Sequence, residues 1–390
     1  MAGDGWLPAG EAAARLGVKR ETLYAYVARG QLRRRPSADG RRSEYAVDDL
    51  DRLGVRGHRG APARREAIAV RSTLTRITPD GPRYRGHLAV DLAGSWTFEE
   101  VVALLWRTPE VAARPVAVPD AVHAAVSASL AGFADDLDPV LRLPVTVIAA
   151  AAVDPLRGDT RPGAVHVAGY RALAALVTAI GGRGGGPLAA QLARGWRGRA
   201  EDRTVRLLDA TLVLLADHEL AASTLAARAA ASTRADPYAV VLAGLAVLGG
   251  SRHGTASRGA ERALRAVHDG GEPDAAIARH VALDVTFGHP LYPDGDPRAT
   301  RLFELVRAHG PARRVADVDA VLAAARDRGL PPPSVDLALA AVTHVLAAPV
   351  GTGGNLFALA RTAGWSAHAL EQQADGHLLR PRAVTPTADD

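Results

Sequence analysis

Apolar residues recur every three or four positions along most of the chain beyond residue 95, the spacing of one face of an α-helix. In the segment 95–106, Val101 and Leu105 share such a face, and Ser95 or Thr97 is placed to cap the start. Comparable patterns follow at 119–133, 136–153, 164–180, 187–195, 203–216, 219–232 and 236–248. Alternating residues around a turn at 72–81 predict one small β-hairpin. The pattern therefore predicts a mainly α-helical protein.

Length and composition narrow this picture. The 390 residues allow two or three domains, and a hydrophobic content of 48% is ample for a large core. Arg, Asp or His interrupts each apolar run well before 18 residues, so we expect no membrane span. The absence of cysteine excludes disulfides, thiolate nucleophiles and cysteine-based zinc sites. Residues 1–6 are acidic and lack the cationic start of a signal peptide, which predicts a cytoplasmic location.

The first 55 residues have a pattern of their own. Ala12, Ala13 and Leu16 form a short apolar face, Gly17 ends that helix, and residues 18–29 predict a second helix. The stretch A-A-A-R-L-G-V-K-R-E-T-L-Y-A-Y-V resembles the MerR and excisionase class of winged helix-turn-helix domains. The resemblance predicts such a domain at 1–55, followed by a Gly-, Arg- and Pro-rich linker at 56–69.

The basic character of the chain belongs to this N-terminal segment. Residues 1–65 hold 14 Lys and Arg against 8 Asp and Glu, whereas the remainder holds 33 against 34. The candidate DNA-binding residues are Lys19 and Arg20 at the start of the second helix and Arg41 and Arg42 beside a predicted turn. A protein-binding or vestigial module fits the same pattern, so a DNA partner is one of several alternatives.

Five short stretches in the second half of the chain carry most of the candidate chemistry. They are A-D-H-E-L at 216–220, G-S-R-H-G at 250–254, F-G-H-P-L-Y-P-D-G-D-P-R at 287–298, S-V-D at 334–336 and F-A-L-A-R-T-A-G-W at 357–365. Arg380 lies in a terminal R-P-R. Taken alone, Asp336 also fits the N-cap of an apolar helix. The set nevertheless supplies a base, hydrogen-bond donors and cations for carboxylates, the groups that joining a thioester to a keto diacid requires.

The order and spacing of these stretches resemble the citrate synthase family over residues 70–385. The resemblance implies that Asp336 is the base, that His253 stabilises the enol of acetyl-CoA, and that His289 polarises the ketone of oxaloacetate. It implies carboxylate binding by His218, Arg298 and Arg361. Arg380 is expected to reach the active site of the partner subunit, which requires a homodimer. The acyl-CoA thioester would be a substrate, and no cofactor is expected.

The resemblance also implies the domain organisation. A large helical domain is expected at 70–254 and 348–390, and a small helical domain at 255–347. The cleft between them would close on oxaloacetate and exclude water.

Departures from the family pattern leave the acyl donor and the role of the chain open. Ser251 and Arg252 precede His253, Pro290 follows His289, and Ser334 replaces an asparagine. Alternatives are therefore a 2-methylcitrate synthase, which takes propionyl-CoA, and a DNA-binding regulator with a citrate synthase-like sensor body. The retained base favours an enzyme. The remaining histidines have no zinc-motif spacing, so the sequence predicts no metal site; those considered are His268, His280, His309, His344, His368 and His377.

Overall fold

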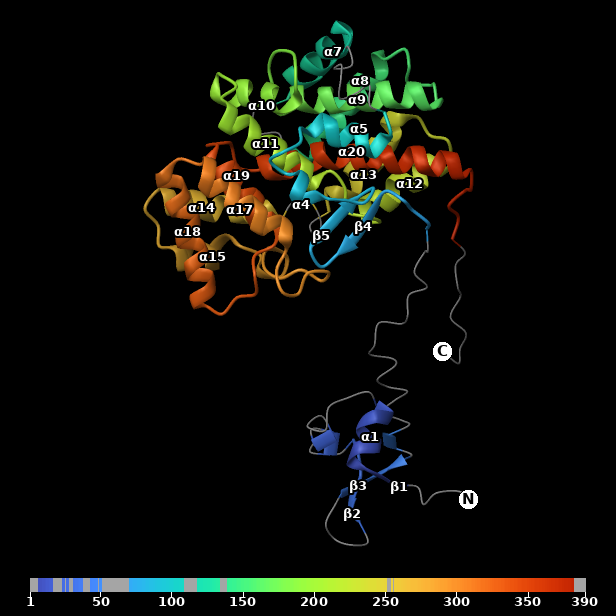
Figure 1. The fold of residues 1–390 in the computed structure, drawn as a ribbon, viewed down its shortest axis with the longest axis vertical. Coiled ribbons are helices and arrows are strands. Elements are labelled where there is room, and N and C mark those ends of the chain that lie inside the picture. Colours follow the sequence, from blue (N-terminus) through green and yellow to red (C-terminus); the bar gives the residue numbers. More distant parts are fainter. Residues whose placement is uncertain are drawn as a thin grey trace. The chain divides into compact units, whose positions relative to one another are not determined.

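The chain divides into two compact units, residues 1–70 and residues 71–390, in a computed structural model. The structure describes residues 6–16, 23–24, 26–27, 31–37, 43–47, 49–50, 70–108, 118–133, 139–250, 254 and 256–381. Figure 1 labels the helices and strands of both units.

The first unit combines a small antiparallel sheet with a short helix. Its elements are β1 (Trp6–Pro8), α1 (Ala9–Leu16), β2 (Arg34–Pro36) and β3 (Ser43–Ala46), with strand order β1-β3-β2. Ala12, Leu23 and Tyr45 are fully buried and form its core together with Leu50. The helix-turn-helix assignment stays a prediction, and the four candidate DNA-binding residues lie outside the described part of the chain.

A three-stranded sheet begins the second unit. It consists of β4 (Thr75–Thr78), β5 (Gly81–Tyr84) and β6 (His87–Leu88), paired antiparallel in that order. Thr78 pairs with Gly81, which has a φ of +121° that suits glycine in a tight turn. This confirms the predicted hairpin, although its second strand runs to Tyr84, beyond the segment that alternates.

Helices make up most of the second unit, which confirms the mainly α-helical fold. The first nine described are α4 (Ala89–Leu92), α5 (Phe98–Trp106), α7 (Asp120–Ala131), α8 (Pro139–Val153), α9 (Pro162–Ala179), α10 (Leu188–Arg197), α11 (Asp202–Leu215), α12 (Ala222–Ser232) and α13 (Pro237–Leu248). Then follow α14 (Ser257–His268), α15 (Pro273–His280), α16 (Leu283–Thr286), α17 (Pro297–His309), α18 (Ala312–Asp327), α19 (Val335–Val345) and α20 (Thr352–Asp375). Thr97 caps α5 through a capping box with Glu100. No described helix is long and apolar enough to cross a bilayer.

Helix α20 runs through the middle of this unit, between α5, α9, α11, α12 and α13 (Figure 1). Its side chains are buried along most of its length, and Trp365 is fully buried. A Cβ at Gly244 of α13 would lie 2.5 Å from the ring of Trp365, so only glycine allows this close packing.

The N-terminus of α20 has no side-chain cap of its own. Glu261 of α14 supplies the missing acceptor, since its carboxylate accepts hydrogen bonds from the backbone N–H groups of Gly351 and Gly353, the latter at 2.6 Å. Glu261 is 4% exposed, so this contact between α14 and α20 is shielded from water.

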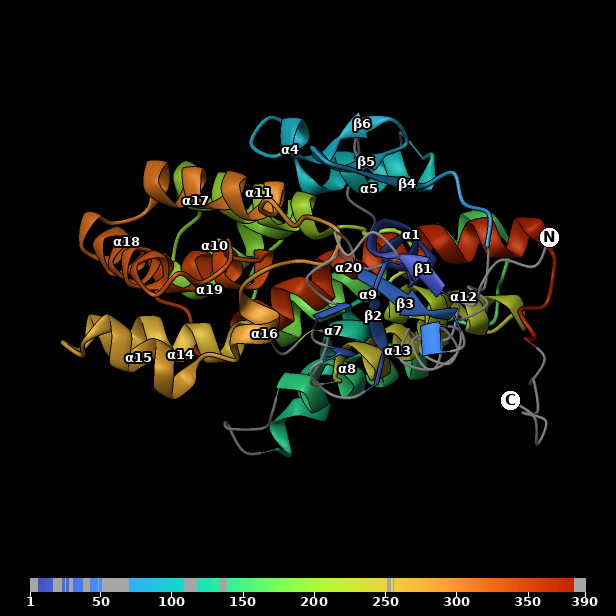
Figure 2. The same ribbon diagram turned by 90° about the horizontal axis from the view of Figure 1, so that it is seen from below.

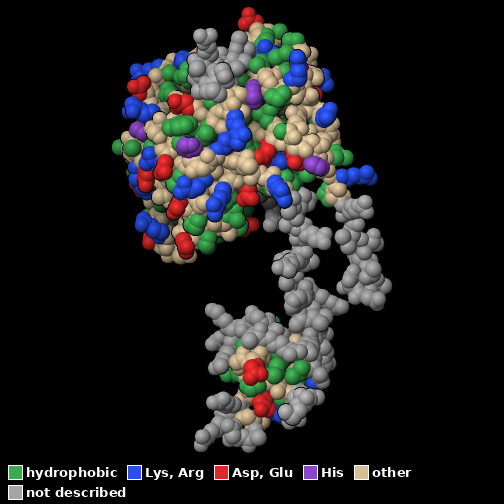
Figure 3. All heavy atoms as spheres, turned by 45° about the vertical axis from the view of Figure 1, so that its right-hand side comes forward, with side chains coloured by type: hydrophobic (Ala, Val, Ile, Leu, Met, Phe, Trp, Pro, Cys, Tyr) green, Lys and Arg blue, Asp and Glu red, His purple; other side chains and the backbone are tan. Residues whose placement is uncertain are grey.

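Helices α14, α15, α17, α18 and α19 gather at one end of the second unit in two perpendicular views (Figure 1, Figure 2). This group falls within the predicted small domain at 255–347, whose boundaries stay a prediction. Basic and acidic side chains are interspersed on the face of the unit shown in Figure 3, as the near-neutral charge of residues 66–390 leads us to expect.

Candidate active site

The structure brings together five of the seven residues proposed to bind or transform substrate. His218 lies in the turn between α11 and α12, and His289 in the loop between α16 and α17. Arg298, Asp336 and Arg361 lie on α17, α19 and α20. Three segments that are distant in sequence, one of them the loop that continues into α17, thus converge with α20.

Two histidines and a tyrosine form one wall of the site. The rings of His218 and His289 meet edge to face, with centroids 5.7 Å apart, and Tyr292 lies 4.9 Å from His289. The hydroxyl of Tyr292 is 3.4 Å from Nε2 of His218. His289 Nδ1 accepts a hydrogen bond from the backbone N–H of Leu291 at 3.1 Å. A neutral His289 therefore carries its proton on Nε2, the nitrogen that remains to donate to a ligand.

Both histidines are neutral at physiological pH. Burial lowers the pKa of His218 well below its usual value, and the cationic Arg298 and Arg361 lower it further. Burial and Arg298 likewise lower the pKa of His289. Neutral imidazoles next to arginines serve as hydrogen-bond donors without adding charge to the site.

Arg298 is buried but paired. Its Nε and Nη2 donate to the two carboxylate oxygens of Asp296, at 3.0 and 2.8 Å. Asp296 also caps α17 by accepting from the backbone N–H of Arg298. The pair holds the guanidinium in a fixed orientation, 5.7 Å above the ring of Tyr292.

Arg361 is buried without a carboxylate partner among the described residues. Its Nε donates to the carbonyl of Leu215 at 3.0 Å, and its guanidinium lies 4.6 Å from the ring centre of Phe357. Nη2 is buried and has no hydrogen-bond partner in the part of the chain that the structure describes. Burial lowers the pKa of Arg361 to about 10, which still leaves the group charged at neutral pH. A buried cation with an unsatisfied donor is a strong attraction for an anion.

The carboxyl of Asp336 faces this cationic region. Burial raises its pKa to about 7; Arg298 and Arg361 oppose the rise, and Asp296 adds to it. Ser334, not Asp336, caps α19, because its hydroxyl accepts from the backbone N–H of Asp336 at 3.2 Å. Asp336 is thus not occupied as a helix cap, and its carboxyl is set to exchange a proton near neutral pH.

Contacts with α20 fix the position of the turn that carries His218. The adjacent Asp217 is fully buried and lies 3.3 Å from Nε2 of His368. Gly364 donates its N–H to the carbonyl of Ala216 at 3.1 Å, and a Cβ there would lie 2.4 Å from Asp217 Oδ1. These contacts set the position of His218 relative to Arg361, one turn away on α20.

Two of the predicted residues are not part of the described cluster. His253 lies outside the described residues, although the neighbouring Gly254 is buried and bonds to the carbonyl of Leu248 at 2.9 Å. Arg380 is exposed beyond α20, and within the described residues it forms no hydrogen bond or ion pair. Its proposed role needs a second subunit and stays a prediction.

Sequence reasoning missed three residues that shape the site: Tyr292, Tyr84 and His368. Tyr292 follows His289 by three residues in a stiff proline-containing loop. This proximity in sequence could have indicated that Tyr292 belongs to the site. Tyr84 is fully buried and donates its hydroxyl to the carbonyl of Leu214 or Asp217, at 3.1 and 3.2 Å. Nothing near Tyr84 or His368 in the sequence indicates these contacts.

The arrangement suits binding of a carbonyl compound with carboxylate groups. Two buried arginines attract the carboxylates, neutral histidines donate to a carbonyl oxygen, and Asp336 accepts a proton. A metal ion is disfavoured at this position because Asp296 and Asp217 are already engaged and Asp336 faces two arginines.

Comparison with known proteins identifies the family of the chain. The sequence profile of the family described as "Citrate synthase, C-terminal domain" matches residues 63–382. The chain therefore belongs to the citrate synthase family. It is 33% identical over 192 residues to citrate synthase 2 of Bacillus subtilis (strain 168), which covers 46% of this chain and 50% of that protein. It is 27% identical over 353 residues to 2-methylcitrate synthase 1 of Corynebacterium glutamicum, with coverage of 80% and 91%.

The fold is also similar to that of a solved citrate synthase from Thermoplasma acidophilum, a ternary complex with carboxymethyl coenzyme A and oxaloacetate. The TM-score is 0.67 at 24% identity, with 83% of this chain and 95% of that chain covered. At this identity the likeness shows the fold alone. The chain spans about half the length of several curated relatives that it matches, including the protein from B. subtilis.

Proposed function

We infer that this protein condenses an acyl-CoA thioester with oxaloacetate. The observation that carries the proposal is Arg361, a buried cation whose Nη2 lacks a partner and whose charge is electrostatically linked to Asp336 and Arg298. Oxaloacetate supplies two carboxylates for such cations and a ketone for His289. The family match supports this assignment.

In the proposed reaction, Asp336 removes a proton from the α-carbon of the thioester, and His253 donates to the thioester oxygen as the enol forms. The nucleophilic α-carbon then attacks the ketone carbon of oxaloacetate. The ketone oxygen takes the proton of His289 Nε2 as the new C–C bond forms. The proton that Asp336 removed then replaces it on His289, so both groups return to their starting states. Water cleaves the thioester, releasing the product acid and the thiol of CoA. His218, Arg298 and Arg361 hold the acceptor during these steps.

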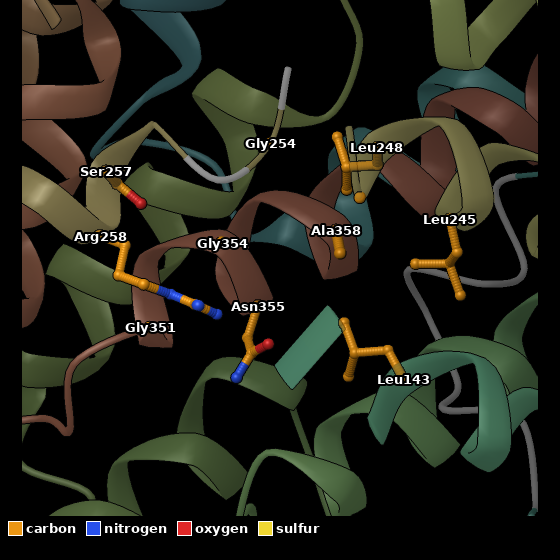
Figure 4. Close-up of a pocket in the computed structure, with 11 residues that line it drawn as sticks. Leu143, Leu245, Leu248, Gly254, Ser257, Arg258, Gly351, Gly354, Asn355 and Ala358 are labelled. Atoms are coloured by element: carbon orange, nitrogen blue, oxygen red, sulfur yellow. The ribbon is translucent and has the colours of Figure 1, made fainter. Parts of the chain in front are cut away.

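A pocket next to the proposed His253 segment is a candidate for part of the acyl-CoA. It is lined by Leu143, Leu245 and Leu248 on one side, and by Gly254 and Gly354 on another. Figure 4 shows Arg258 and Asn355 extending along one wall of this mostly apolar pocket. Such a lining accepts an apolar chain that carries a few polar groups.

Acetyl-CoA is the proposed donor, and propionyl-CoA is the second candidate because 2-methylcitrate synthases are among the relatives. The test is a thiol-release assay with oxaloacetate and a panel of acyl-CoAs. We expect release that depends strictly on oxaloacetate and is fastest with one short donor. Folded protein that turns over no combination of acyl-CoA and keto acid would refute the enzymatic proposal and favour a ligand sensor.

A homodimer is proposed on two grounds. The family resemblance assigns Arg380 to the partner's site, and α8 exposes an apolar face on which Leu141 and Ile148, two turns apart, are 58% and 56% exposed. Mixing Arg380→Ala with Asp336→Asn subunits should restore activity through hybrid dimers that contain one intact site. Absence of recovery after demonstrated subunit exchange would contradict a shared site.

The N-terminal unit is proposed to bind DNA as a winged helix-turn-helix, supported by its excess of basic residues and its resemblance to the MerR class. Full-length protein should retard duplex DNA, with an affinity that falls steeply as salt increases. Replacing Arg41 and Arg42 with alanine should reduce that salt dependence by about one unit of slope for each phosphate that the variant no longer binds. Binding that is absent even at low salt would rule out this role.

A further inference from the structure

Two histidines and an aspartate meet where α14 and α19 end. Asp336 of the proposed active site lies at the opposite end of α19. His268 Nδ1 lies 2.7 Å from Oδ2 of Asp317, and His344 Nε2 lies 2.9 Å from the same oxygen. One ligand atom from each residue lies within 4.8 Å of the other two. The side chains are 19%, 13% and 4% exposed, in the order His268, Asp317 and His344.

Negative groups lie around the three side chains. His268 is the last residue of α14, and His344 lies in the last turn of α19, so two negative helix ends point toward the group. Asp317 adds a full negative charge, and Asp269 and Glu261 line the adjoining cavity. Three arginines oppose them. Arg313 and Arg314 donate to the carbonyls of His268 and His344, at 3.4 and 2.9 Å, and Arg265 lines the same cavity.

The cavity beside the cluster is polar and has a volume of about 100 Å³, enough for several water molecules. His268 and His344 both line it. A metal ion held by three protein atoms therefore has room for a water ligand on the fourth side, which completes tetrahedral coordination.

We propose that His268, Asp317 and His344 form a binding site for a divalent transition metal, with Zn²⁺ as the best match. Two imidazoles and one carboxylate are a common zinc ligand set. The three ligand atoms lie within 4.8 Å of one another, so a small outward shift of each side chain opens the space for an ion. The sequence predicted no such site because its ligands come from three helices and share no short motif. This site is separate from the proposed condensation and does not rest on it.

Metal binding requires only a change of tautomer at the two rings. Without metal, both rings donate an N–H to Asp317 Oδ2. On binding, each ring proton moves to its other nitrogen, and His268 Nδ1 and His344 Nε2 become ligands. The ion would join the ends of α14 and α19 to α18.

The test uses the full-length protein, first stripped with a chelator and then dialysed against Zn²⁺ or Co²⁺. We expect one tightly held ion per chain and a visible Co²⁺ absorption typical of tetrahedral nitrogen and oxygen ligands. Asp317→Asn and His268→Asn should each weaken Zn²⁺ binding on the order of 100-fold and abolish the Co²⁺ spectrum. His280→Asn is the matched control, because it removes a histidine of the same helix group at the end of α15.

Circular dichroism of each variant establishes that it is folded, so that loss of binding is not loss of structure. Two results overturn the proposal. One is wild-type protein that holds no ion after dialysis and shows no Co²⁺ spectrum, which identifies the cluster as a hydrogen-bonded triad only. The other is undiminished binding by both ligand variants, which places the metal elsewhere. The proposal is supported if the His280→Asn variant binds the metal tightly and both ligand variants do not.

Discussion

Asp336→Asn should make the protein more stable at alkaline pH while removing the proposed base. The carboxyl has a pKa of about 7 in the folded chain, against an ordinary value of 3.8. A raised pKa means that the folded state binds this proton more tightly than the unfolded state. Stability from this group is therefore complete below pH 4 and is lost as pH rises towards 7.

The shift of about three units corresponds to a penalty of about 4 kcal/mol at pH 8 and less than about 2 kcal/mol at pH 5. Asparagine has a similar shape and no charge, so it avoids the penalty. Asp336 is partly exposed, so water can stabilise its charged form. The two penalties are therefore upper limits. We expect the variant to gain about 2–4 kcal/mol at pH 8 and clearly less at pH 5.

Urea unfolding at fixed protein concentration, followed by tryptophan fluorescence, measures this gain. Four of the five tryptophans lie in the second unit, so the signal reports mainly on the unit that contains Asp336. The control is Asp202→Asn at the exposed start of α11, where the side chain is 91% exposed. It should change the free energy of unfolding by no more than about 0.5 kcal/mol at either pH.

A pH-independent difference, or a variant that is less stable than wild type at pH 8, would refute the raised pKa. In that case the carboxyl would be stabilised in its ionised form by Arg298 and Arg361 more than burial destabilises it. Its role as a base active near neutral pH would then lose its physical support.

Three further predictions concern the same site. The kcat/KM of the wild type for acyl-CoA should rise about tenfold per pH unit below 7 and level off above pH 7, because Asp336 must be ionised to accept a proton. A kcat/KM that does not change from pH 5 to 8 would contradict this. Arg361→Lys should raise the KM for oxaloacetate on the order of 10- to 100-fold, because lysine keeps the charge but loses the planar pair of donors; an unchanged KM would place the carboxylate elsewhere. Gly364→Ala should cost about 1–3 kcal/mol of stability and most of the activity, because the new Cβ meets Asp217 and the Ala216 carbonyl. Gly163→Ala is the control: nothing lies within 4 Å of its new Cβ, so it should reduce neither stability nor activity.

The helices of this fold could be predicted because their apolar residues follow the helical period. The pattern at 236–248 corresponds to α13 (Pro237–Leu248). The sequence offered Ser95 or Thr97 as the cap of α5, and the structure shows that it is Thr97. Such features depend on residues a few positions apart. Local spacing in the sequence is therefore enough to indicate them.

The chemistry of the site depended on contacts that local spacing does not reveal. The family resemblance indicated which residues would converge, but not that Asp296 occupies two nitrogens of Arg298 while Nη2 of Arg361 stays unsatisfied. Asp336 illustrates the same limit, because Ser334 and Asp336 are both acceptable helix caps by sequence. Only the folded backbone shows that the serine takes this role and leaves the carboxyl to its surroundings.

The carboxylate of Glu261 connects α14 to the start of α20 at a single point. Its two oxygens hold the N–H groups of Gly351 and Gly353, and such bonds tolerate a change of angle better than a change of distance. A rotation of α14 and its neighbours about this contact would keep the ends of α14 and α20 together. Arg361 lies about 14 Å along α20 from that point. Such a rotation would move the helices that carry Asp336 relative to the substrate while Arg361 keeps its position.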